Sequence, residues 1–192
     1  MDKQEKVDIF KDELNSIERE DIREFTKYCI GIAPDYVFFE CPSSSSGKHH
    51  CVEELGGDGT VIHTRKIFYV VDELVRAWDV VKYRDIVLAA ALLHDLAKQG
   101  NPRNYRKHTV KDHPQIMAEM VNTAYHEAFV DVIDYETVAA IYSCIFFHYG
   151  PWTLKKNAKP MSEYSVVELL VYTADYISSR RAIHVDYKNR GA

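Results

Sequence analysis

The sequence predicts an all-α fold, and three observations lead to this prediction. Over residues 60–181, apolar side chains recur every three or four positions, which is the spacing of one helix face. In the same range, no convincing apolar–polar alternation bounded by hairpin turns indicates strands. Glycine and proline fall between the periodic segments, where helices end. The 192 residues suffice for one compact core and are short for two domains.

Residues 1–41 are expected to form a helical region packed on the core. Their apolar residues have a helix-like but imperfect spacing, which predicts one or two helices. These residues are Ile9, Leu14, Ile17, Ile22 and Phe25. Gly31 and Pro34 stop the pattern. A serine-rich loop at residues 42–47 then opens the main part, residues 42–192, which we expect to be one compact unit.

A helix that begins near Val61 is expected to carry His63 on its buried face. Counted from His63, apolar residues follow at offsets of 4, 7, 8, 11 and 15, which trace one face of a helix. They are Ile67, Val70, Val71, Leu74 and Trp78. A single histidine on such a face is most often a core residue, so this placement alone does not indicate a ligand.

Residues 85–97 predict a central, buried helix, because they are apolar on every face until Gly100 ends the segment. His94 and Asp95 are expected in its last turn. A buried carboxylate is costly unless it is paired or binds a metal. No basic residue lies one turn before Asp95 to pair with it.

Three further helices each bring one polar group to a buried face or end. One begins at the N-cap Asp112, which places His113 at its start. Another, over about residues 132–148, ends at His148 because Gly-Pro follows. The last, over about residues 162–181, carries Asp175 on an apolar face.

Five predicted helices therefore each supply a metal-competent group to an inward position. The groups are His63, His94 with Asp95, His113, His148 and Asp175. Imidazoles and carboxylates around a divalent cation would satisfy these buried groups together. The sequence thus predicts a metal centre.

The order of these residues resembles that of the HD-domain metal-dependent phosphohydrolase superfamily, whose pattern is H…HD…D. Here it reads His63, then His94-Asp95 beginning 31 residues later, then Asp175. The glycine-rich residues 56–64 and the segment around the His-Asp pair also fit. The resemblance covers roughly residues 42–181. It implies an HD helical bundle with a metal at its centre, held by these four residues.

The resemblance also implies an activity. Metal-bound water would attack a phosphate ester or anhydride of a nucleotide or short oligonucleotide. The cofactor would be one or two divalent ions, among which the sequence does not distinguish Mn, Fe, Zn, Co, Ni and Mg. Asp95 would be catalytic and would bridge two ions. His113 and His148 match the extended pattern of dinuclear members, but Phe147 stands where those often carry a second histidine, so the two histidines could instead contact phosphate.

Lys98 departs from the small bacterial 5′-deoxynucleotidases of this superfamily, which carry glutamate there. Lysine cannot act as a carboxylate base, so their detailed mechanism does not transfer. Lys98 could stabilise phosphate charge, as a catalytic and substrate-binding residue, or be a favourable charge at a helix C-terminus. Arg180 and its neighbour Arg181 could likewise bind phosphate or stay solvated.

Aromatic and histidine residues near the predicted centre leave similar alternatives open. Tyr149 and Trp152 follow His148 and could stack a nucleobase or form a hydrophobic helix stop. Residues 48–50, Lys-His-His, could border the pocket or form a polar loop.

Charge and composition exclude several classes of protein. The net charge of −5 argues against binding long nucleic acid through a broad basic surface. Residues 1–24 lack a signal-peptide core, and no run of 18 apolar residues suggests a membrane span, so a cytoplasmic location is expected. The four cysteines show no C-x-x-C spacing and are expected to be free thiols. The expected partner is a small phosphorylated molecule, and homo-oligomerisation stays open.

Three other functions remain compatible with the pattern. A cyclic-nucleotide phosphodiesterase or nuclease would use the same centre. An HD-type di-iron oxygenase would contain iron and consume oxygen. A non-catalytic nucleotide sensor would bind tightly without turnover.

Overall fold

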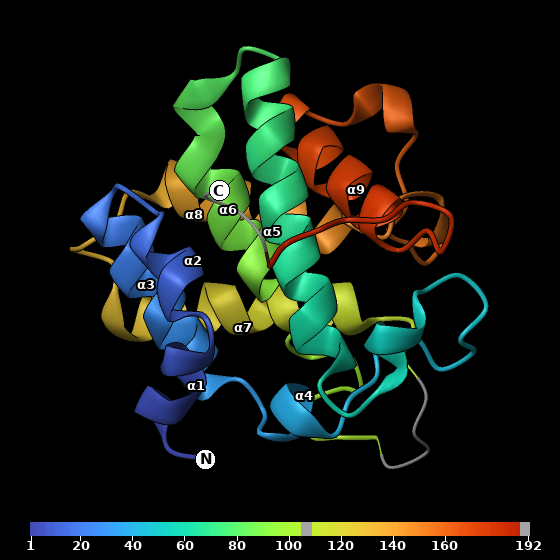
Figure 1. Ribbon diagram of the computed structural model, residues 1–192. Helices are drawn as coiled ribbons and strands as arrows, with labels where there is room; N and C mark the ends of the chain where they lie inside the picture. The colour runs from blue at the N-terminus through green and yellow to red at the C-terminus, as the bar shows by residue number, and fades with distance from the viewer. Residues whose placement is uncertain (105–108, 189–192) are drawn as a thin grey trace.

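The computed structural model describes residues 1–104 and 109–188, and every regular element in these residues is helical (Figure 1). The predicted all-α class is therefore confirmed. The α-helices are α1 (Lys3–Ile9), α2 (Lys11–Asn15), α3 (Glu20–Ile32), α4 (Tyr36–Phe39), α5 (Gly59–Ala77), α6 (Arg84–Leu93), α7 (His113–Ala128), α8 (Tyr135–Phe147) and α9 (Val166–Ser178). Short 3-10 helices are η1 (Val52–Leu55), η2 (Val81–Tyr83), η3 (Gly150–Trp152) and η4 (Met161–Glu163). No helix in the described residues is long and apolar enough to cross a membrane.

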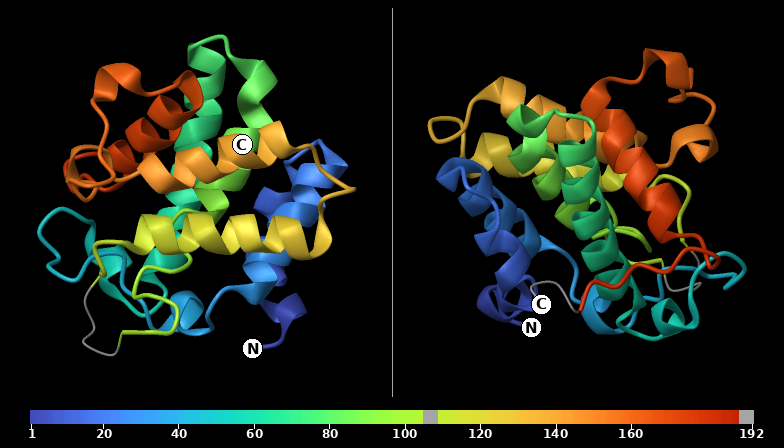
Figure 2. Two further views of the ribbon diagram at one scale, coloured as in Figure 1. Left: turned by 180° about the vertical axis from the view of Figure 1, so that it is seen from behind. Right: turned by 45° about the horizontal axis from the view of Figure 1, so that its top comes forward.

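Helix α6 forms the centre of the bundle. Its residues 87–93 are all fully buried, as their all-round apolar character predicts. Helices α3, α5, α8 and α9 pack against it, and α5 also packs along α9 (Figure 1). Helices α7 and α8 lie alongside each other and face the viewer when the molecule is seen from behind (Figure 2, left). The metal-competent residues thus come from helices in mutual contact.

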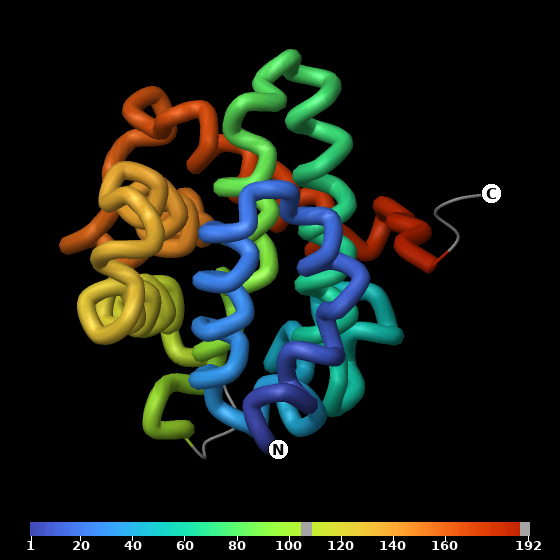
Figure 3. Tube along the Cα trace, turned by 90° about the vertical axis from the view of Figure 1, so that its left-hand side faces the viewer, coloured from blue at the N-terminus to red at the C-terminus, as the bar shows by residue number. Residues whose placement is uncertain are grey.

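The N-terminal residues form four short helices rather than the one or two predicted. A capping box at Asp2 starts α1, and Phe10 closes that helix and precedes α2. Gly31 does not end α3, which continues to Ile32; Pro34 ends it, because the residue before a proline avoids the helical conformation. Figure 3 shows α1, α2 and α3 together on one side of the bundle, where α3 packs on α6 and α7.

The glycine-rich residues before His63 form a tight turn into α5. A Cβ atom on Gly59 would overlap the carbonyl oxygen of Glu54, and one on Gly57 would overlap that of Phe39. The Cys41 amide donates to the Gly57 carbonyl, and the Cys41 carbonyl accepts from the Thr60 amide. Glycine is therefore required here because two earlier segments pack directly against the start of α5, and this contact fixes η1 beside it.

Three helices are shorter than the sequence pattern suggested. Helix α6 ends at Leu93, so His94 is its C-cap and Asp95 follows in a turn, instead of both lying in the last helical turn. Helix α8 begins after Asp134, whose side chain caps it, rather than near residue 132. Helix α9 begins after a capping box at Ser165 and ends at Ser178, inside the expected range of 162–181.

Candidate metal centre

The six metal-competent residues converge on one region of the bundle. They are His63 on α5, His94 and Asp95 directly after α6, His113 at the start of α7, His148 directly after α8, and Asp175 on α9. Nε2 of His63 lies 3.0 Å from Oδ1 of Asp175, although 112 residues separate them. Nε2 of His113 lies 3.0 Å from Oδ1 of Asp95. Five helices and their ends therefore bring together the residues that the sequence predicted.

Three of the histidines are oriented by backbone carbonyls. The Nδ1 atoms of His94, His113 and His148 lie 2.8, 2.7 and 2.7 Å from the carbonyl oxygens of the residues three positions earlier. Since a carbonyl only accepts hydrogen bonds, each Nδ1 carries the proton and donates it. Each Nε2 therefore keeps a lone pair available, which is how proteins fix metal-binding imidazoles.

Buried polar atoms without partners test whether a cation fits here. Among the described residues, Nε2 of His94 and Oδ1 of Asp95 are buried and form no hydrogen bond, although His113 approaches Asp95. Such atoms are costly in a protein interior. A divalent cation would satisfy both, and imidazole nitrogen and carboxylate oxygen are its ordinary ligands. The residues present therefore fit a metal ion.

The ligand atoms form two overlapping sets that share Asp95. One set is His63, His94 and Asp95, and the other is Asp95, His113 and His148. In each set, the ligand atoms all lie within 4.8 Å of one another. Asp175 adjoins the first set through His63. The arrangement can accept one or two cations, with Asp95 between them.

Charged partners control ionisation at the centre. Burial opposes the charge of Asp95, but Lys98 and the neighbouring histidines hold the pKa of Asp95 well below its usual range. Burial alone would lower the pKa of His63, yet the carboxylates of Asp175 and Glu54 raise it to about 9. Burial and the nearby His94 lower the pKa of His148 to about 3. His148 is therefore neutral at pH 7, whereas His63 is protonated in the metal-free protein and must release one proton to bind a metal.

A cavity of about 470 Å³ opens onto this centre. Its wall includes His63, Asp95, His148 and Asp175. The predicted substrate-binding residues Lys98, Tyr149, Trp152 and Arg180 also line it, as do His49 and His50. Arg181 is exposed and lies outside the lining. The volume is typical of a pocket for a small molecule.

Several cavity residues escaped the sequence reasoning. Tyr172 and Tyr176 lie on α9 with Asp175 and face the same cavity, as do the serines 43–46 and Lys111. The sequence did contain a signal for Tyr172 and Tyr176: they lie one helical turn apart on either side of the predicted ligand Asp175, a spacing that places them on the same side of the helix. Glu54 also escaped, since nothing in its local sequence marks it. The four cysteines are free thiols, as predicted.

Comparison with known proteins gives one match. No curated protein and no solved structure matches the chain. The model of the HD domain family matches residues 60–180, a range that contains all six metal-competent residues. This match covers more than half of the 192 residues. The protein therefore belongs to the HD-domain superfamily of metal-dependent hydrolases.

Proposed function

We propose that this protein is a metal-dependent phosphohydrolase that cleaves a phosphate ester or anhydride of a nucleotide or short oligonucleotide. One observation carries the proposal: a buried set of metal-ligand residues adjoins a cavity that is also lined by lysine and arginine side chains and by aromatic rings. A hydrolytic metal centre, a phosphate and a planar base would each find matching chemistry in this one space.

The cations would be held by two groups of residues. His63, His94, Asp95 and Asp175 would hold the first, and Asp95, His113 and His148 the second. A bound divalent cation polarises phosphoryl oxygens and lowers the pKa of a bound water molecule. The four histidines and two carboxylates supply neutral and anionic ligand atoms in one region of the bundle. Their role would be to hold the cations in a fixed position beside the cavity.

Phosphate would be bound by cationic side chains of the cavity. Lys98 is only 6 % exposed, touches Asp95 and lines the cavity beside the ligand set. Lys111, which is exposed, and Arg180, which is half-buried, line the same cavity. A buried ammonium next to the reacting phosphoryl group would stabilise the charge that develops on its oxygens, so we assign this role to Lys98.

A nucleobase would be bound by Trp152 and Tyr176. Their ring centroids lie 6.5 Å apart, and the planes are within 13° of parallel. Two stacking contacts of ~3.5 Å each would place such rings ~7 Å apart on either side of a planar base. Both rings are partly exposed, at 56 % and 42 %, and line the cavity. This pair favours a nucleotide over a phosphate ester that lacks an aromatic ring.

Phosphate release by metal-loaded protein from nucleotides, sugar phosphates and glycerol phosphate tests the proposal. We expect release from nucleotides that EDTA abolishes. Trp152→Ala should lower kcat/KM for nucleotides about 10-fold, since stacking on an aromatic ring contributes ~1–3 kcal/mol per base. Trp78→Ala is the matched control, because Trp78 is similarly exposed but lies outside the cavity lining. Metal-replete protein that binds nucleotides without hydrolysing them, or that consumes oxygen with iron, would contradict the proposal.

A further inference from the structure

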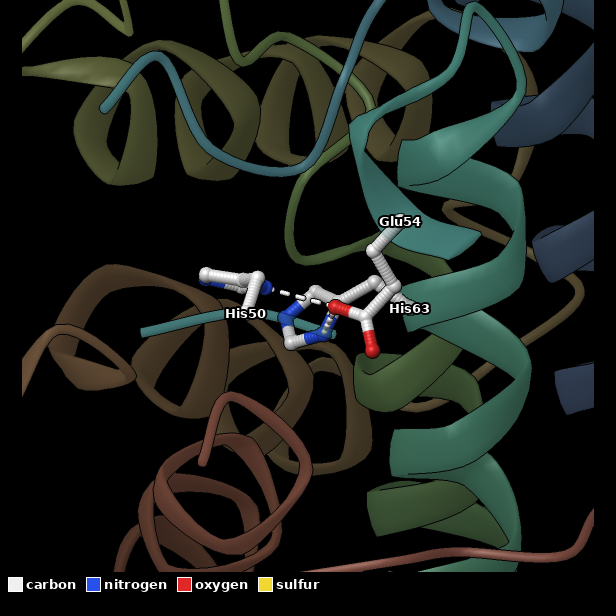
Figure 4. A group of neighbouring side chains, drawn as sticks. All are labelled: His50, Glu54 and His63. Atoms are coloured by element: carbon white, nitrogen blue, oxygen red, sulfur yellow. Dashed lines mark hydrogen bonds and ion pairs between the residues drawn. The ribbon is translucent and has the colours of Figure 1, made fainter. Parts of the chain in front are cut away.

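Glu54 is a buried carboxylate beside the metal centre, and it lies outside the range of the HD-domain match, residues 60–180. It lies on η1, has no exposed surface and approaches Nδ1 of His63. Nδ1 of His63 is 3.3 Å from Oε2 of Glu54 (Figure 4). The other ring nitrogen, Nε2, is 3.0 Å from Oδ1 of Asp175. His63 is thus held between two carboxylates, one at each ring nitrogen.

Glu54 is itself fixed by three further contacts. Its Oε1 accepts from Nζ of Lys66 at 2.6 Å. Its Oε2 lies 2.6 Å from Nδ1 of His50 (Figure 4). Oε2 also lies 3.0 Å from Oγ of Ser43, which donates to it. Glu54 is therefore held by a buried ammonium group and by two hydrogen-bonding side chains, so its carboxylate cannot move freely.

His63 differs from the other three histidines in how its Nδ1 atom is satisfied. Those three lie at helix ends, and their Nδ1 atoms donate to nearby backbone carbonyls. His63 is the fifth residue of α5, where the helix's own hydrogen bonds occupy the carbonyls. Among the described residues, its Nδ1 forms no hydrogen bond, and Glu54 is the carboxylate that faces it.

We propose that Glu54 is a positioning residue that holds the Nδ1 proton of His63 and directs Nε2 toward the cation. A neutral imidazole carries one proton, so coordination through Nε2 leaves that proton on Nδ1, next to Glu54. A carboxylate in this position fixes the ring and makes the ligating nitrogen more basic. The inference rests on the proposed function, because it requires that His63 binds a metal.

A third cation among His50, Glu54 and His63 is the competing explanation. Their potential ligand atoms also lie within 4.8 Å of one another. The ammonium group of Lys66, only 1 % exposed, already occupies Oε1 of Glu54. A neutral imidazole that binds a cation through Nε2 keeps its proton on Nδ1, so Nδ1 of His63 is not free to bind another cation beside Glu54, and the contacts favour a positioning role.

Zn²⁺ affinity of Glu54→Gln protein tests the proposal without using activity. Competition against a chromophoric chelator should show that one Zn²⁺ ion binds 10- to 100-fold more weakly, as is usual when the partner of a metal-binding histidine is lost. Glu53→Gln is the matched control. Like Glu54, Glu53 contacts Lys66 at 2.6 Å, but of these two glutamates Glu54 is the one that contacts His63. Its Zn²⁺ affinity should stay within about 2-fold of wild type.

A second measurement uses the wild-type protein and so does not depend on the variant's folding. In Zn²⁺-loaded protein, ¹H–¹⁵N correlations of the imidazole rings should show the His63 proton on Nδ1. A proton on Nε2, with the metal on Nδ1, would overturn the proposal. The proposal would also be overturned if properly folded Glu54→Gln protein bound Zn²⁺ as tightly as wild type.

The two proposals fail in distinguishable ways. Wild-type protein that binds no Zn²⁺ through His63 would remove the proposed metal centre, and this inference with it. Wild-type protein that binds Zn²⁺ normally, with no effect of Glu54→Gln, would overturn the inference alone. His50→Ala protein should bind Zn²⁺ with an affinity within about 3-fold of wild type. If that variant instead bound one Zn²⁺ ion fewer than wild type, a cation would be bound by His50 and Glu54, and the positioning role would be overturned.

Discussion

Removal of Asp95 is expected to destabilise the metal-free protein, for a reason that the sequence alone did not suggest. The sequence shows no basic residue one turn before Asp95 that could pair with it. In the structure, however, Lys98 contacts Asp95 from one turn later. Asp95 is 2 % exposed and Lys98 is 6 % exposed. Asp95→Ala would therefore leave a buried ammonium group without its carboxylate.

The expected cost follows from the burial of this pair. Breaking a buried ion pair by removing one partner costs about 3–5 kcal/mol, because the remaining charge stays desolvated. Replacing both partners by apolar residues removes that penalty. Asp95→Ala/Lys98→Met protein should therefore recover most of the loss, and the two substitutions should be coupled by about 2–4 kcal/mol.

Urea denaturation in EDTA, followed by far-ultraviolet circular dichroism, measures both effects. A loss of ~4 kcal/mol at a slope of ~2 kcal/mol/M would lower the unfolding midpoint of Asp95→Ala protein by ~2 M. Lys98→Met alone completes the double-mutant cycle. A midpoint shift below ~0.5 M for Asp95→Ala, or a double variant no more stable than Asp95→Ala, would show that the two charges do not form a buried pair in solution.

Three other predictions follow from the same region. His148→Ala or His113→Ala should lower metal stoichiometry from about two to one and sharply reduce kcat, because a two-metal clamp stabilises both attacking and leaving oxygens; one ion in metal-replete wild type would refute this. In EDTA, His63 has a folded pKa of about 9, above its unfolded value, so its stabilisation should be complete below pH ~6.5 and lost as pH rises through 9. The difference in unfolding free energy between wild type and His63→Gln, measured at pH 6 and pH 9.5, should therefore shrink at the higher pH. Gly59→Ala should lower Tm by several degrees, as its Cβ atom would overlap the Glu54 carbonyl oxygen; an unchanged Tm would mean that this close packing does not persist in solution.

The sequence by itself determined the helical class and the metal-competent residues. Helical periodicity is a local property, so it placed His63 and Asp175 on buried faces before their partners were known. The order of the ligand residues was equally readable, and the structure brings all six together. Helix ends were less accurate, by up to four residues, because capping contacts and turns decide where a helix starts and stops. Helix α6 stops at Leu93 and leaves His94 and Asp95 in the turn that follows.

Only the tertiary structure decided which side chains surround the ligands. Glu54 is one of 29 acidic residues, and no local pattern separates it from the others. It becomes a partner of His63 because Gly59 lets η1 pack against the start of α5. The Asp95–Lys98 pair depends in the same way on a turn whose side chains are buried by the surrounding helices. Contacts of this kind arise where separate elements meet, so their geometry and energy cannot be read from residue spacing along the chain.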